Sequence, residues 1–117
     1  MRHLKEGKKF GRLRGDRISF LRNLANDVIR AGKIETTETR AKAVRPIVER
    51  LITHAKKQDL ASRRLISSRV QNVRIVKKLC DDIAPRYADR NGGYLRITKL
   101  QKTRKRDGVK LARVEFV

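Results

Sequence analysis

Residues 91–98, NGGYLRIT, mark the point at which this chain changes from a helical to an extended pattern. The opening Asn-Gly-Gly is typical of a turn that requires positive φ values. Apolar and polar side chains then alternate over 95–98, which predicts a strand. A second alternation over 112–116 follows the basic segment 102–108, which ends in an Asp-Gly turn signal. The stretch therefore predicts two terminal strands joined by a basic hairpin.

Upstream of this turn, apolar side chains recur at helical spacing. The expected helices cover residues 17–31, 38–57, 60–69 and 72–86, and their expected N-caps are Asp16, Thr37, Asp59 and Asn72. Short polar side chains suit these positions because they accept hydrogen bonds from the unpaired amides of a first turn. Pro46 is expected to bend the second helix because it removes one amide hydrogen bond and crowds the carbonyl of Lys42.

The segment KIETT (residues 33–37) is short, alternating and β-prone, and it predicts the third strand that a two-stranded hairpin needs for stability. The predicted fold is therefore α+β, with a cluster of about four helices packed with a small three-stranded sheet and a basic N-terminal extension. We expect an arm over residues 1–15 and a single α+β domain over residues 16–117.

The N-terminal stretch MRHLKEGKKFGRLRGDR (residues 1–17) carries seven basic side chains and only two acids. It contains three glycines at intervals of four and no apolar face of either period. Such a segment buries too little apolar surface to fold alone. It fits a basic arm that orders against nucleic-acid phosphates, and equally a solvated terminus.

Charge favours a polyanionic partner. The chain has 117 residues, with 32 Lys and Arg against 12 Asp and Glu, and a net charge of +20. An excess of this size implies a partner with many negative charges. Contact with a membrane is not expected, because no segment approaches the roughly 18 apolar residues of a spanning helix. The single cysteine, Cys80, excludes an internal disulfide and suits the reducing cytoplasm.

Catalytic chemistry finds little support in the sequence. The two histidines, His3 and His54, are far apart, and Cys80 lies on the apolar stripe of its helix. Asp81 and Asp82 are helical neighbours, so their side chains diverge by about 100° and cannot form an acid–base pair. We therefore expect no enzyme, no catalytic or metal-binding residues, no cofactor and no small-molecule substrate.

Basic residues are spread over the whole chain rather than confined to one stripe. This pattern favours a protein embedded in folded RNA, which recognises shape and phosphates. Two other hypotheses stay open at this point. One is a DNA-binding protein that uses the helices over 60–69 and 72–86, and the other is an RNA-modifying enzyme, which would need a substrate pocket.

Particular motifs carry a resemblance along nearly the full length. They are Met1-Arg2-His3-Leu4-Lys5, Gly7, Arg12, Arg17, Arg22-Asn23, Ile34, Thr36-Thr37, Ala41-Lys42, Leu51-Ile52, Ala55-Lys56, Arg63-Arg64-Leu65, Val76, Lys78-Leu79, Ala84-Pro85-Arg86-Tyr87, Arg90, Gly92-Gly93-Tyr94, Arg96-Ile97 and Val114-Glu115-Phe116-Val117. In these motifs the chain resembles the bacterial large-subunit ribosomal protein seventeen family. The opening and the Gly-Gly-Tyr-x-Arg-Ile stretch are the most specific.

The resemblance implies a structural constituent of the large (50S) ribosomal subunit, in the cytoplasm, that binds 23S ribosomal RNA near the exit of the peptide tunnel. It implies neighbouring large-subunit proteins as further partners, and neither catalysis nor a cofactor. The expected RNA-binding residues are Arg2, His3, Lys5, Lys8, Lys9, Arg12, Arg14, Arg17, Arg22, Arg63, Arg64, Arg90 and Arg96.

Two departures from the family pattern affect these expectations. Where the family typically has a Ser-Ser-His run, this chain has Arg14-Gly15-Asp16, so a phosphate contact from Arg14 is expected instead. The segment 102–109 is also more basic and lacks the usual proline before the last strand, which leaves its path on RNA open.

Overall fold

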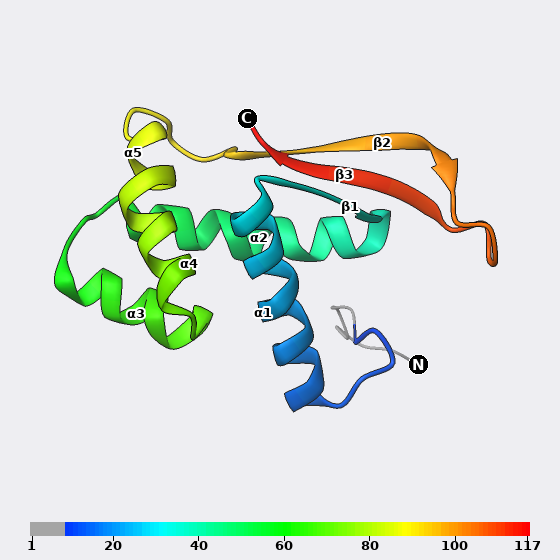
Figure 1. Cartoon of the computed structure of the whole chain (residues 1–117), viewed down its shortest axis with the longest axis horizontal. Coiled ribbons are helices and arrows are strands. Elements are labelled where there is room, and N and C mark those ends of the chain that lie inside the picture. The colour runs from blue at the N-terminus through cyan, green and yellow to red at the C-terminus, as the bar shows by residue number, and fades with distance from the viewer. Residues whose placement is uncertain (1–8) are drawn as a thin grey trace, which may run out of the picture.

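The computed structural model describes residues 9–117 of the chain. In order, its elements are α1 (Arg14–Ala31), β1 (Lys33–Thr37), α2 (Glu38–Ala55), α3 (Leu60–Val70), α4 (Val73–Lys78), the π-helical turn η1 (Leu79–Ile83), α5 (Ala84–Arg86), β2 (Leu95–Thr103) and β3 (Lys110–Phe116). The central helix is α2, which contacts the sheet as well as α1, α3 and η1 (Figure 1). The α+β prediction is confirmed.

The three strands form one antiparallel sheet in the order β1-β3-β2. Ile34, Val114 and Ile97 lie opposite one another in adjacent strands and pack against the helical core. The predicted third strand over 33–37 is confirmed, and β2 is longer than predicted. The pairing of β2 with β3 is irregular between Lys99 and Thr103. The Thr103–Lys110 pair lies beyond the last pair of β1, Thr37 with Leu111, so the β2–β3 hairpin extends past the rest of the sheet (Figure 1).

Three of the four predicted N-caps are confirmed. The side chain of Thr37 accepts a hydrogen bond from the Arg40 amide, Asp59 accepts from Ser62, and Asn72 accepts from two amides of α4. The Asp16 cap is wrong, because α1 already begins at Arg14 and Asp16 lies inside the first turn. There its carboxylate still faces the positive end of the helix dipole. The division between arm and domain at residue 15 stays a prediction.

The second helix runs through Pro46 without interruption. Pro46 and Lys42 are both exposed. The carbonyl that the proline ring deprives of an amide partner therefore lies on the solvent side of α2, where water can satisfy it. The predicted bend is not tested and stays a prediction.

The predicted helix over 72–86 is interrupted by a π-helical turn at Leu79–Ile83. The amide of Ala84 donates to the carbonyl of Leu79, five residues earlier. Pro85 follows directly, and a proline has no amide for the usual bond and clashes with the carbonyl four residues before it. We attribute the wider turn to this proline, an effect that was not predicted from the sequence.

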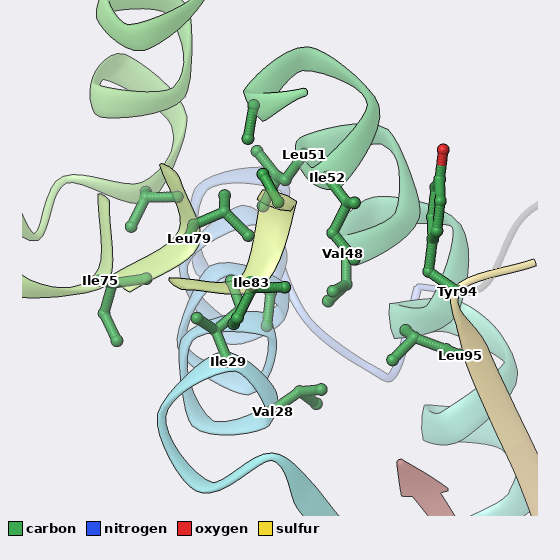
Figure 2. Close-up of a cluster of buried hydrophobic side chains, with 14 of the residues drawn as sticks. Val28, Ile29, Val48, Leu51, Ile52, Ile75, Leu79, Ile83, Tyr94 and Leu95 are labelled. Atoms are coloured by element: carbon green, nitrogen blue, oxygen red, sulfur yellow. The ribbon is translucent and has the colours of Figure 1, made fainter. Parts of the chain in front are cut away.

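The hydrophobic core joins the helical cluster to the sheet. Val28 and Ile29 of α1, Ile52 of α2 and Leu79 of η1 are all fully buried (Figure 2). At the sheet end, the Tyr87 and Tyr94 rings lie 5.3 Å apart, and the Tyr87 hydroxyl donates to the Val117 carbonyl at 2.9 Å. One core therefore fixes the helices relative to the sheet.

Candidate nucleic-acid interface

The segment before α1 is attached to that helix through aromatic contacts. The Phe10 and Phe20 rings lie 5.4 Å apart, and the Arg12 guanidinium lies 4.0 Å from the Phe20 ring centroid. Arg40 of α2 approaches the same ring at 5.1 Å. Arg12 also donates to the Phe10 carbonyl at 3.1 Å. Phe20 therefore fixes residues 9–13 against the start of α1.

Four expected RNA-binding residues come together at this end of α1. Lys9, Arg12 and Arg14 are exposed, and Arg17 is half-buried one turn into the helix. They combine four positive charges with the positive end of the α1 dipole, an arrangement that attracts phosphate. The expected sites Arg2, His3, Lys5 and Lys8 lie outside the described residues.

Arg22 ties α1 to α3. Its Nε donates to the Arg69 carbonyl at 3.1 Å, and its Nη1 donates to the Gln71 side-chain oxygen at 3.1 Å. These bonds hold the guanidinium beside a groove between α1, α2 and α3. A structural role therefore accompanies the RNA contact expected of Arg22.

The two expected sites on α3 differ in their surroundings. Arg63 lies 3.4 Å from the Asp81 carboxylate of η1, and both side chains are about half exposed. Arg64 is exposed and takes part in no ion pair among residues 9–117. Arg64 is therefore the freer of the two to meet a phosphate.

Arg90 precedes the turn before β2, and Arg96 is the second residue of that strand. Arg90 is exposed, its carbonyl accepts from the Lys56 ammonium, and its Nε lies 3.4 Å from the Gly92 carbonyl. Arg96 lies on the outer face of the sheet, 3.9 Å from Glu115. The expected sites thus form no single patch, since they occupy the start of α1, the surface of α3 and the turn before β2.

The β2–β3 hairpin is a further basic surface. Every residue from 101 to 108 is exposed. Arg104 pairs with Asp107 across the tip, which lowers the pKa of the Asp107 carboxyl. Lys105 and Arg106 lie beside this pair and take part in no ion pair among the described residues.

Two acidic side chains, one on β1 and one at the start of α2, are already neutralised. Glu35 lies 2.6 Å from Lys102 and 3.4 Å from Arg113, and hydrogen bonds from these two bases lower the pKa of its carboxyl. Glu38 lies 3.0 Å from Lys42, which lowers the pKa of that carboxyl as well. These carboxylates therefore repel a polyanion less than their formal charge suggests.

Three arginines that were not among the expected sites also belong to these surfaces. Arg40 joins the cluster around Phe20, and Arg50 and Arg69 line the groove beside Arg22. Arg50 follows the apolar Ile47 by three residues, so helical spacing places both on one side of α2. That spacing was a usable signal, whereas the contact between Arg40 and Phe20 depends on how two helices cross.

Catalytic and metal chemistry gains no support from the described residues. Cys80 is buried, as predicted, and burial raises the pKa of its thiol, so the thiolate is scarce near neutral pH. Within residues 9–117, no three His, Cys, Asp or Glu side chains gather as a metal site would require.

The hydropathy of the helices bears on membrane contact. In the part of the chain that the structure describes, none of the helices combines the length and apolar character needed to cross a membrane.

Comparison with known proteins identifies the family. The model of the ribosomal protein L17 family matches residues 20–117. The chain belongs to the ribosomal protein L17 family. It is similar over its whole length to large ribosomal subunit protein bL17 of Thermus thermophilus, with 48% identity over 117 residues that cover 99% of that protein.

Further L17 relatives give the same result. The bL17 protein of Caldanaerobacter subterraneus is 50% identical over 110 residues, which cover 94% of this chain and 97% of the relative. That of Hydrogenobaculum sp. is 47% identical over 117 residues, 100% of this chain and 99% of the relative. The predicted family is confirmed, and the chain is a structural ribosomal protein of the large subunit.

Proposed function

We propose that this L17 protein acts in the cytoplasm as a component of the large ribosomal subunit that binds 23S ribosomal RNA through phosphate and shape contacts. Its partners are this RNA and neighbouring large-subunit proteins. By the family resemblance, its place is near the exit of the peptide tunnel. The proposed contacts from residues 9–117 are Lys9, Arg12, Arg14, Arg17, Arg22, Arg63, Arg64, Arg90 and Arg96, and those from the N-terminal stretch are Arg2, His3, Lys5 and Lys8.

The observation that carries this proposal is the wide distribution of unneutralised positive charge. Among residues 9–117, ion pairs engage ten of the 29 basic side chains. Basic side chains outside these pairs occur at the start of α1, on α3 and at the hairpin tip, and the tip lies far from the two helices (Figure 1). A surface charged at several remote places suits a protein that RNA surrounds, rather than one that faces a single groove.

Salt dependence tests the RNA contacts. Filter binding of the purified chain to a 23S transcript is measured from about 50 to 200 mM salt, over which six to ten phosphate contacts lower affinity about 10³- to 10⁵-fold. Duplex DNA of equal charge is the competitor. A shallow salt slope, or an equal preference for the duplex, would contradict the proposal and favour a DNA-binding role.

Location is tested separately in purified large subunits. Amine-reactive cross-linking of Lys105, followed by mass spectrometry, identifies the neighbouring proteins. Cross-links to proteins that surround the tunnel exit support the proposed place. Cross-links only to proteins remote from the exit would overturn the location and leave RNA binding intact.

A further inference from the structure

A groove between α1, α2 and α3 combines apolar and basic side chains, and no ligand has yet been assigned to it. It consists of two adjoining cavities of about 350 Å³ and 160 Å³ that share Arg22, Ile47 and Arg69. We propose that this groove binds one unstacked nucleobase of the ribosomal RNA, with its flanking phosphates held by the arginines. This inference rests on the proposed function, since it names the ligand class of one part of the RNA-binding surface.

The floor of the groove is apolar and partly open to solvent. Ile18 is 47% exposed, and Leu21 and Ile47 are half-buried beside it. A base that leaves its stack loses apolar contact on both faces, and apolar side chains restore part of that contact. The floor therefore suits the face of a base better than it suits a phosphate.

The rim of the groove is positively charged without compensation. Arg22, Arg50 and Arg69 line it, and none of the three takes part in an ion pair among residues 9–117. Arg22 is held in place by the Arg69 carbonyl and the Gln71 side chain. A guanidinium fixed in this way binds phosphate with less loss of side-chain entropy.

Two other cavities serve as internal comparisons. The cavity beside Cys80 is lined by Asp59, and the cavity between α2 and the hairpin is lined by Glu38. In each cavity the carboxylate offsets positive charge of the same lining, which comes from Arg63 in the first cavity and from Lys42 and Lys110 in the second. No acidic residue of the described chain lines the groove, so its charge favours RNA over the other two cavities.

Asn26, which lines the smaller cavity, carries an unpaired acceptor. Asn26 is only 7% exposed, and its Nδ2 donates to the Val70 carbonyl at 3.3 Å. Its Oδ1 is buried and has no hydrogen-bond partner in the described structure. A buried acceptor without a donor is unfavourable, and the amino or imino group of a base is a suitable donor.

The first test removes the apolar floor without changing charge. Ile18→Ser is compared with Val73→Ser, which alters an apolar side chain of α4 that is 82% exposed. We expect Ile18→Ser to weaken binding to the 23S transcript about five- to tenfold with an unchanged salt slope, because a base contact and no phosphate contact is lost. We expect Val73→Ser to bind as the unaltered chain does. Thermal melting confirms that both variants fold.

The second test locates the base. Acylation of RNA 2′-hydroxyls reports nucleotide flexibility for all four bases. We expect one nucleotide that is flexible in free RNA to become rigid with the unaltered chain and to stay flexible with Ile18→Ser.

Three other results would overturn either the groove proposal or the proposed function. Equal affinities and equal acylation patterns for the two variants, with tight and salt-sensitive binding, would overturn the groove proposal and leave the proposed function standing. Cross-links from the groove to another protein in intact subunits, together with the same acylation pattern, would overturn it in favour of a protein partner. Failure of the unaltered chain to bind the transcript would overturn the proposed function itself.

Discussion

The helical cluster and the β2–β3 hairpin differ in what keeps them ordered. In the cluster, Ile29, Ile52 and Leu79 are fully buried and belong to one continuous core. In the hairpin, residues 101–108 are all exposed, and the tip depends on the Arg104–Asp107 pair and on backbone hydrogen bonds. Stability and ligand contact therefore reside in different parts of the fold, and substitutions should separate them.

The largest expected effect is a loss of core stability. Leu79→Ala removes a fully buried side chain from η1, where three helices and the π turn pack together. We expect the free energy of unfolding to fall by about 2–5 kcal/mol, because a cavity remains after the substitution. Urea denaturation followed by circular dichroism measures this change. A loss below about 1 kcal/mol would mean that the cluster repacks around the gap.

At the hairpin tip, the expected effect is on binding alone. Lys105→Gln combined with Arg106→Gln removes two exposed charges that make no ion pair among the described residues. The salt slope of RNA binding should fall by about 1.4 to 1.8, since each phosphate contact contributes about 0.7 to 0.9. The free energy of unfolding should change by less than about 0.5 kcal/mol. An unchanged slope would show that the tip does not meet phosphates.

The segment 9–13 is intermediate between the two regions, because it is mostly exposed and yet attached to α1. Phe20→Ala removes the ring that Phe10 and Arg12 contact. An aromatic pair contributes about 0.5–1.5 kcal/mol, so the Arg12 amide, which donates to Lys9, should exchange its hydrogen faster. Hydrogen exchange measures this rate. If the Arg12 amide stays partly protected from exchange in Phe20→Leu, the apolar part of the contact is confirmed. If it stays fully protected in Phe20→Ala, Phe20 does not attach residues 9–13 to α1.

The smallest expected effect is on how stability changes with pH, through the carboxyl of Asp59. Hydrogen bonds from Ser62 lower the pKa of the Asp59 carboxyl below its usual value of about 3.9. A carboxyl whose folded-state pKa is lowered stabilises the fold above the unfolded value, and this contribution is lost as pH falls through the folded value. Asp59→Asn keeps a capping oxygen but cannot ionise. We expect Asp59→Asn to have the same free energy of unfolding as the unaltered chain at pH 7. Between pH 5 and 3 the variant should lose less stability than the unaltered chain, as measured by urea denaturation at each pH.

Local patterns in the sequence were sufficient for most of the fold. Apolar spacing gave the helices, alternation gave the three strands, and the caps at Thr37, Asp59 and Asn72 followed from short polar side chains before apolar runs. The Asp16 cap failed because a helix can begin at any nearby residue when no capping bond fixes its start. The π turn was missed because it depends on how Pro85 shifts the hydrogen bonds before it.

The candidate site was less accessible from sequence. Charge and motifs indicated which basic residues could bind RNA. They could not show which of these side chains make ion pairs or hydrogen bonds within the protein. Arg63 faces Asp81, and Arg22 bridges two helices, because elements distant in sequence meet there. The groove combines residues of three helices, and no local period in the sequence brings Asn26, Arg50 and Arg69 together.

The central position of β3 has a consequence for synthesis on the ribosome. Both other strands pair only with β3, and β3 follows them in the chain. During translation β1 and β2 therefore emerge without a partner, whereas all the helices precede the β2–β3 hairpin and can begin to pack. Until residues 110–116 have left the peptide tunnel, the two strands lack partners and their edges stay open to wrong pairing. The charged side chains along β2 and its hairpin disfavour such pairing in the nascent chain.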